Sequence, residues 1–227
     1  MTELNIKELT EEATNPQPWD FSNQQLYDLC RNYPKHKEPG VILAKILIIS
    51  RVYAAAIERR RNKGASDDND DFYLKPAVPK IRESGIDDWI AKAKAEAENG
   101  IDYTEGAMQR ERPPLAVLVH GKVTSLFYEI SGLEKRSLAS KYLHFHVPDL
   151  FFIYDTRAVN AMRLFSEHIP RASNVPYALK DGKYVDNEYR KFYEKSLSLL
   201  RHCNEKTGRR LSPRQLDNLL LAVSRGV

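Results

Sequence analysis

Apolar side chains recur at intervals of three and four residues along most of this chain, which is the spacing of α-helices. No segment shows the sustained alternation of apolar and polar residues that marks a half-buried strand. The pattern predicts a helix that begins at Ser22, helices over 41–61, 86–98, 115–130 and 137–145, one from Thr156 to just before Pro170, and two more over 187–207 and 213–224. We therefore expect an all-α protein, a compact multi-helix fold of about eight helices.

The chain divides into a short arm and one domain. Residues 1–18 are polar and include two prolines, so we expect a polar N-terminal arm there and a single all-α domain over 19–227. Residues 62–79 have no apolar period and contain four aspartates, one glycine and two prolines, which predicts a mobile acidic loop inside the domain.

One segment is apolar on nearly every side. Residues 41–57 contain few polar positions, and a helix that is apolar all round is usually buried at the centre of a fold. We expect this helix to be crossed by the helices over 115–127 and 137–145, with Leu47 in the core. The same segment carries Lys45 and Arg51 and is too short and too charged to span a bilayer, so no membrane partner is expected.

Composition narrows the class further. The chain has 227 residues and only two cysteines, Cys30 and Cys203, which excludes a disulfide scaffold and any four-cysteine zinc or iron–sulfur site. His144 and His146 lie two apart, and helical residues at that spacing face different ways, so they do not predict a metal pair. We expect neither a cofactor nor a metal. The polar, acidic first residues predict no secretory signal and favour a cytoplasmic location.

The positive charge is unevenly placed. Residues 201–227 contain six basic and two acidic side chains. Their net charge of +4 equals the formal net charge of the whole chain. A second basic cluster covers residues 59–63. Such clusters attract phosphate backbones, but they are also common as solvated helix ends, where cations favour the C-terminal dipole. Both interpretations stay open from the sequence alone.

The most informative stretch is Ile130–Phe165, with the sequence ISGLEKRSLASKYLHFHVPDLFFIYDTRAVNAMRLF. It predicts a helix, a short hairpin around Gly132, a second helix that begins near Ser137, an apolar loop, and Asp155 at the start of a third helix. This arrangement resembles the helix-hairpin-helix DNA glycosylase superfamily of base-excision repair, in the branch that lacks a lyase lysine. The resemblance rests on Arg136-Ser137-Leu138-Ala139-Ser140, on Phe152-Ile153-Tyr154-Asp155, and on the 18-residue step from Ser137 to Asp155.

The resemblance implies a DNA-binding enzyme that cleaves the N-glycosidic bond of a flipped base. Positive charge builds on the sugar as that bond breaks, and a fixed carboxylate such as Asp155 can stabilise it or activate water. The aromatic residues before Asp155 would desolvate it, and the helix after it would keep it ionised. A plain N-cap is an equally good interpretation of Asp155.

A lyase needs a lysine amine, and Ser137 at the matching position cannot supply one. Lys135 is an alternative catalytic residue if the hairpin carries an insertion, whereas Lys141 is expected on the helix surface. The resemblance implies duplex DNA as the partner. The candidate DNA-binding residues are Gly132, Lys135, Arg136, Arg157, Arg209, Arg210 and Arg214. The candidate walls of a base pocket are Tyr142, Phe152 and Tyr154.

The chain also departs from the family pattern. The family's hairpin usually has two glycines, and here only Gly132 is present, with Glu134 and Lys135 where small residues are expected. This departure favours a second function class, a non-catalytic helical module that binds nucleic acid or a protein partner, in repair or in defence. The step from Ser137 to Asp155 favours the enzyme.

Overall fold

The computed structural model describes residues 5–59, 69–100, 113–172 and 185–225. All regular structure within these ranges is helical, which confirms the all-α prediction. The helices are α1 (Ile6–Thr14), α2 (Asp20–Asn32), α3 (Pro39–Val52), α4 (Asn69–Phe72), the π-helical turn η1 (Tyr73–Ala77), α5 (Val78–Glu83), α6 (Ile86–Glu98), α7 (Leu115–Ser131), α8 (Arg136–His146), α9 (Thr156–Leu164), α10 (Asn187–Thr207) and α11 (Pro213–Arg225). In the part of the chain so described, no helix is both long and apolar enough to cross a membrane.

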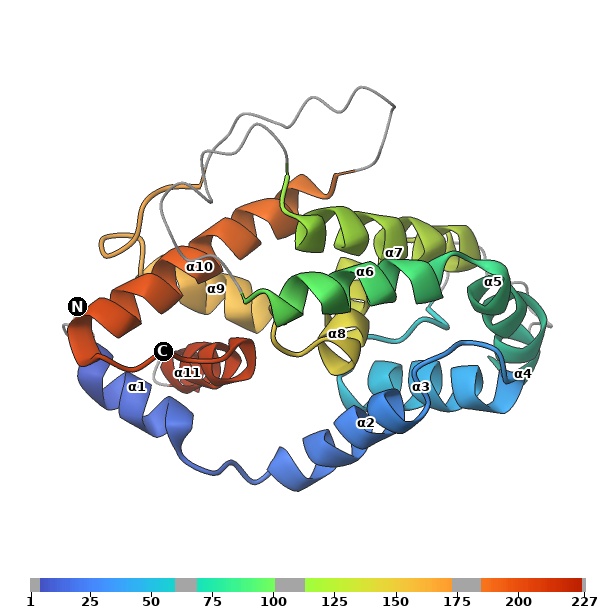
Figure 1. Ribbon diagram of the computed structural model, residues 1–227, viewed down its shortest axis with the longest axis horizontal. Helices are drawn as coiled ribbons and strands as arrows, with labels where there is room; N and C mark the ends of the chain where they lie inside the picture. Colours follow the sequence, from blue (N-terminus) through green and yellow to red (C-terminus); the bar gives the residue numbers. More distant parts are fainter. Residues whose placement is uncertain (1–4, 60–68, 101–112, 173–184, 226–227) are drawn as a thin grey trace.

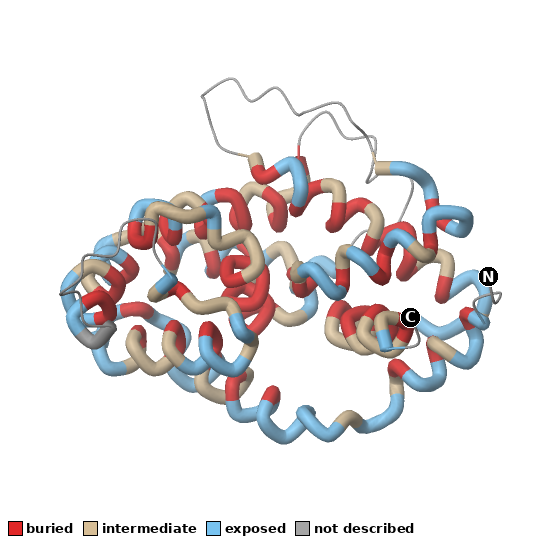
Figure 2. Tube along the Cα trace, turned by 180° about the vertical axis from the view of Figure 1, so that it is seen from behind, coloured by how far each residue is buried: buried red, intermediate tan, exposed pale blue. Residues whose placement is uncertain are grey.

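Helix α8 is the centre of the fold. Figure 1 shows α1, α9, α10 and α11 gathered at one end of the molecule, α3, α4 and α5 at the other, and α8 between the two groups. Every residue of α8 from Leu138 to His146 is buried. Figure 2 shows the buried positions on the inner sides of the helices and the exposed ones on their outer sides. The helix with no exposed side is therefore α8, not the segment 41–57.

Helix α3 is amphipathic rather than buried all round. Its inward face carries Ile42, Ile46 and Ile49, which are fully buried, while Ile48 and Val52 are exposed. It packs mainly against α2, α5 and α8. Leu47, expected in the core, is only partly buried against it. The sequence did not show which side of α3 faces the core, because apolar residues also occupy its solvent-exposed side.

Helix α3 also ends earlier than its sequence predicts. The chain turns after Val52 with Ala54 at a φ of 50°, in the left-handed region. The Ala55 N–H donates to Ser50 O at 2.8 Å and the Ala54 N–H to Arg51 O at 3.3 Å, which is the bond pair of a Schellman motif. Glycine normally occupies the left-handed position, so an alanine there gives no sequence signal for the stop.

Two segments predicted as irregular contain helices. Residues 6–14, inside the expected polar arm, form α1, which packs against α10 and α11 with Ile6, Thr10 and Ala13 buried. Residues 69–79, inside the expected mobile loop, form α4, η1 and the start of α5, and Phe72 and Tyr73 are buried there. The loop prediction is therefore wrong for residues 69–79, while residues 62–68 lie outside the described ranges. In each of these segments only a few buried residues mark the inward face, and they are too few to show a helical period in the sequence.

Four residues, 132–135, connect α7 to α8. Gly132 is the C-cap of α7 with a φ of 70°, and its N–H donates to Tyr128 O at 2.7 Å. The Ser131 hydroxyl donates to Phe127 O at 2.8 Å. A left-handed cap is what glycine allows without steric cost, so this glycine ends α7 and turns the chain into α8.

A buried carboxylate joins three of the helices. Asp186 caps α10 by accepting hydrogen bonds from the N–H groups of Glu188 and Tyr189, both at 3.1 Å. Nε of Arg136, at the start of α8, donates to both of its oxygens at 2.6 and 2.7 Å. His120 of α7 donates from Nε2 to Arg136 O at 3.1 Å and stacks on Tyr189 with ring centroids 3.6 Å apart. Burial lowers the pKa of His120 to about 4, so the ring is neutral.

The turn after α3 gives a test of this fold. Ala54→Gly should raise the free energy of unfolding by about 1 kcal/mol, because glycine removes the steric cost of the left-handed conformation. Chemical denaturation of the two proteins measures the difference. Ala55→Gly, one residue further on, is the matched control and should lower stability, because there glycine only adds freedom to the unfolded chain. Equal losses in both variants would contradict the assigned turn.

Candidate functional site

Asp155 lies where the apolar loop 151–153 ends and α9 begins. Its Oδ1 accepts a hydrogen bond from the Ala158 N–H at 2.9 Å, so the residue is the N-cap of α9. Its Oδ2 lies 3.4 Å from Nζ of Lys141 on α8. The side chain is 26% exposed, although residues 151–153 of the preceding loop are buried. One carboxylate oxygen therefore caps α9, and the other pairs with the Lys141 ammonium.

Lys141 is buried, which corrects the expectation that it lies on a helix surface. Its side chain is 4% exposed. Besides the Asp155 carboxylate, Nζ contacts the Tyr53 carbonyl oxygen at 3.1 Å, and it lies 5.8 Å from the centre of the Tyr53 ring. Lys141 thus joins the end of α3 to the start of α9. It lies one helical turn after Ser137, on the same side of α8.

A second ion pair lies beside the first. Nη1 of Arg214 donates to Oδ2 of Asp217 at 2.6 Å, and both belong to α11. Burial raises the pKa of Asp217 to about 6, and the charge of Asp155 raises it too, against the opposing effect of Arg214 and Lys141. We call Lys141, Asp155, Arg214 and Asp217 the Asp155 cluster. It contains two carboxylates, of which one is partly exposed and the other buried with weakened acidity.

Two tyrosine hydroxyls lie near this cluster. The Tyr53 hydroxyl donates to the Asn23 side-chain oxygen, and the Tyr27 hydroxyl donates to Nε2 of His144 at 2.7 Å. Burial raises the pKa of Tyr27 and raises that of Tyr53 to about 12, so both hydroxyls keep their protons. Burial lowers the pKa of His144 to about 4, and its Nδ1–H donates to Phe151 O at 2.8 Å. Tyr27, Tyr53 and His144 are therefore uncharged hydrogen-bonding groups near the charged side chains of the Asp155 cluster.

The described residues provide no candidate metal centre. Within those ranges no three His, Cys, Asp or Glu side chains come together as metal ligands could. Both nitrogens of His144 have the partners given above, and Nδ1 of His146 donates to Tyr142 O at 2.7 Å. The two histidines therefore stabilise the core through separate contacts.

Lys135 makes its hydrogen bonds outside the Asp155 cluster. Its ammonium donates to the carbonyl oxygens of Ala56 and Arg59, at 2.7 and 2.6 Å, and so holds the chain that follows α3. Burial, and then the charge of Arg59, lower its pKa to about 8. Ser137, the other candidate beside Asp155, is half-buried in the first turn of α8. The lysine next to Asp155 is Lys141, which the sequence did not favour.

The expected phosphate-binding residues fall into two groups. Arg136 and Arg214 are engaged in ion pairs with the buried carboxylates of Asp186 and Asp217. The other arginines lie on the surface, as does the half-exposed Gly132 connection. The exposed members are Arg157, Arg209 and Arg210. Arg209 also donates to the Thr14 hydroxyl at 3.4 Å. Structural roles therefore account for Arg136 and Arg214.

The aromatic residues proposed as pocket walls are mostly core residues. Tyr142 is fully buried, and its hydroxyl donates to Nε2 of His36 at 2.8 Å. Phe152 is buried against Tyr193, with ring centroids 5.1 Å apart. Only Tyr154 reaches the surface, where Arg136 lies 5.7 Å from its ring centre. Tyr142 and Phe152 therefore lie in the core, whereas the sequence predicted them on the wall of an accessible pocket.

No family model, no curated protein and no solved structure matches this chain. The site must therefore be interpreted from its geometry. Sequence reasoning missed Lys141, Asp217 and Asp186. Two signals were present: Lys141 follows Ser137 by one helical turn, and Asp217 follows Arg214 by three residues on the apolar side of α11.

The raised pKa of Asp217 can be measured directly. Its carboxyl carbon, followed by NMR as pH is lowered, should titrate with a midpoint near pH 6. Asp155→Asn should lower that midpoint, because it removes the negative charge that disfavours ionisation of Asp217. Asp149→Asn, at an exposed position in the loop before α9, is the control and should leave it unchanged. An unchanged midpoint in Asp155→Asn would show that the two carboxylates are not coupled.

Proposed function

We propose that this protein binds DNA and hydrolyses the N-glycosidic bond of a flipped base, with Asp155 as the essential carboxylate. The observation that carries the proposal is the setting of Asp155: a partly exposed carboxylate, fixed by the first turn of α9 and paired with buried Lys141. The resemblance of residues 130–165 to helix-hairpin-helix glycosylases supports the same assignment.

The chemistry needs a negative charge beside the sugar. As the bond from C1′ to the base nitrogen breaks, positive charge develops on the sugar ring, and the Asp155 carboxylate stabilises it. Water then forms the new bond to C1′, its proton passes to Asp155, and the departing base takes up a proton from solvent. Lys141 and the α9 N-terminus hold the carboxylate in place through this step.

Hydrolysis fits the contacts better than a lyase reaction that starts from Lys135. A lyase needs a free amine that attacks C1′. The Lys135 amine is occupied by two carbonyl oxygens, and Ser137 carries no amine. The proposed enzyme is therefore monofunctional, and DNA contacts are assigned to the connection at Gly132, to Arg157 in the first turn of α9, and to Arg209 and Arg210 in the loop before α11.

A non-catalytic binding module remains the second candidate function, on a specific observation. Arg136 and Arg214, which a DNA-binding surface would use, point into internal ion pairs. The hairpin also has one glycine where the family pattern has two. A protein with this scaffold could hold DNA or a protein partner without cleaving a bond.

Asp155→Asn tests the catalytic assignment. Asparagine caps a helix as well as aspartate does, so folding should survive, while base release should fall by about 10²- to 10⁴-fold. The assay is release of free base from duplexes that carry mismatched or damaged bases. Asp149→Asn, nearby and exposed, is the matched control and should keep full activity.

The same reactions with added borohydride separate hydrolysis from lyase chemistry. No covalent protein–DNA adduct is expected. An adduct would overturn the monofunctional assignment and point to a lysine, with Lys141→Gln and Lys135→Gln identifying which one. Unchanged base release in Asp155→Asn would overturn the role of Asp155. Binding to every duplex without release from any would favour the binding module.

DNA binding has its own test. Affinity for a duplex should fall steeply as salt rises, and Arg157→Gln should reduce the slope of log K against log salt by about 0.9, the value for one lost phosphate contact. Arg163→Gln, exposed in the last turn of the same helix, should leave the slope unchanged. A slope that is equal in both variants and the parent would show that α9 does not contact the phosphates.

A further inference from the structure

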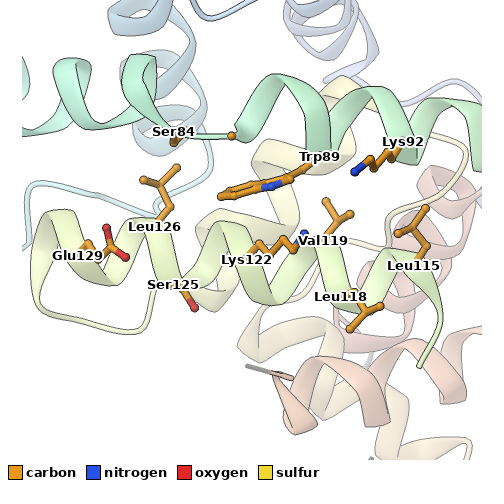
Figure 3. Close-up of a pocket in the computed structure, with 11 residues that line it drawn as sticks. Ser84, Trp89, Lys92, Leu115, Leu118, Val119, Lys122, Ser125, Leu126 and Glu129 are labelled. Atoms are coloured by element: carbon orange, nitrogen blue, oxygen red, sulfur yellow. The ribbon is translucent and has the colours of Figure 1, made fainter. Parts of the chain in front are cut away.

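A groove runs between α6 and α7, and none of the residues of the Asp155 cluster lines it. It has a volume of about 510 Å³. On α7 its lining begins at Leu115 and ends at Glu129, and the positions between follow the three- and four-residue spacing of one helix face. At 1.5 Å per residue this face is about 21 Å long, which is the length of four helical turns. Figure 3 shows the groove and its lining residues.

The floor of the groove is apolar and centred on Trp89. The indole reaches from α6 across to α7 and lies among Val119 and Leu126 (Figure 3). Gly85 makes room for it, because a Cβ at that position would lie 3.0 Å from the indole Nε1. A half-buried tryptophan with leucine and valine beside it is the kind of surface that anchors an apolar partner.

The rim of the groove is positively charged at its centre. Lys92 of α6 and Lys122 of α7 are exposed on opposite walls, and Nζ of Lys122 lies 5.5 Å from the centre of the Trp89 ring. Glu129 supplies a negative charge at the far end of α7. An occupant that fits this rim carries carboxylates near its middle, where it meets both lysines.

We propose that this groove binds an amphipathic α-helix of a partner protein, about four turns long, with an apolar face on Trp89 and acidic residues beside Lys92 and Lys122. The length of the lining along α7 supports a helix rather than a compact ligand, since a helix in a groove is recognised at the i, i+3, i+4 and i+7 positions. The two lysines on opposite walls select the acidic partner over a basic one. The proposal is independent of the function assigned to Asp155.

Trp89 provides the probe. The chain has two tryptophans, so Trp19→Phe leaves Trp89 as the sole indole and gives a fluorescence signal from inside the groove. The ligand is a synthetic 14-residue helix with leucines on one face and glutamates flanking them. Saturable change in Trp89 emission is expected. Lys92→Glu combined with Lys122→Glu should weaken binding by tenfold or more, while Lys7→Glu, exposed on α1, should not change it.

Four results would overturn the proposal. The first is no saturable change with the acidic helix in the properly folded protein. The second is equal binding of a helix in which every glutamate is replaced by lysine, since the rim would then not select charge. The third is displacement of the peptide by dodecanoate at equal concentration. The fourth is loss of the signal through self-association of this chain, seen by ultracentrifugation. These last outcomes would assign the groove to a lipid-like ligand or to a second copy.

Discussion

The buried carboxylate of Asp186 is the constraint on which the arrangement of the central helices depends. It fixes the start of α10, binds Arg136 at the start of α8, and lies beside neutral His120 of α7. A buried charge without its partner costs several kcal/mol, so α8 can take only the position that brings Arg136 to Asp186. This contact fixes the start of α8, while the left-handed cap at Gly132 ends α7 and the buried residues 138–146 hold the rest of α8.

Because α8 is fixed, its N-cap residue Lys135 and its buried residue Lys141 can hold the chain that packs beside it. Lys135 and Lys141 both hold carbonyl oxygens of the segment that follows α3, which includes the left-handed Ala54. Backbone strain of this kind persists only where neighbouring contacts enforce it. Lys141 connects that strained turn to Asp155, so the candidate site and the irregular segment after α3 are parts of one assembly.

Much of the fold could be predicted from the sequence, because most helices carry a clear period or cap. The expected ranges 86–98 and 187–207 match α6 and α10, and the start signal at Ser212-Pro213 marks α11. The early end of α3 could not be predicted, since alanine replaces the usual glycine in its terminal turn. Helix α1 was missed because only three of its residues are buried.

The candidate site was predictable only in part. Asp155 was identified from its position after an apolar run, and it does cap α9. Its partners could not be predicted in the same way, because Lys141 and Asp217 come close to Asp155 only through the tertiary packing of α8, α9 and α11. A charged residue on an apolar helix face is the one local sign of such a contact, and it does not specify the partner.

The buried histidines described above make folding a proton-coupled reaction. Burial holds the pKa of His36, His120 and His144 at about 4 and that of His146 well below 6.5, the ordinary value, so the folded chain stays neutral at these rings where the unfolded chain takes up protons. Between about pH 6.5 and 4 acid therefore drives the equilibrium toward the unfolded chain. Asp217, with its pKa raised to about 6, acts the other way, but it is one group against four. Acidification through this range therefore lowers the stability of the folded protein without any protease or ligand.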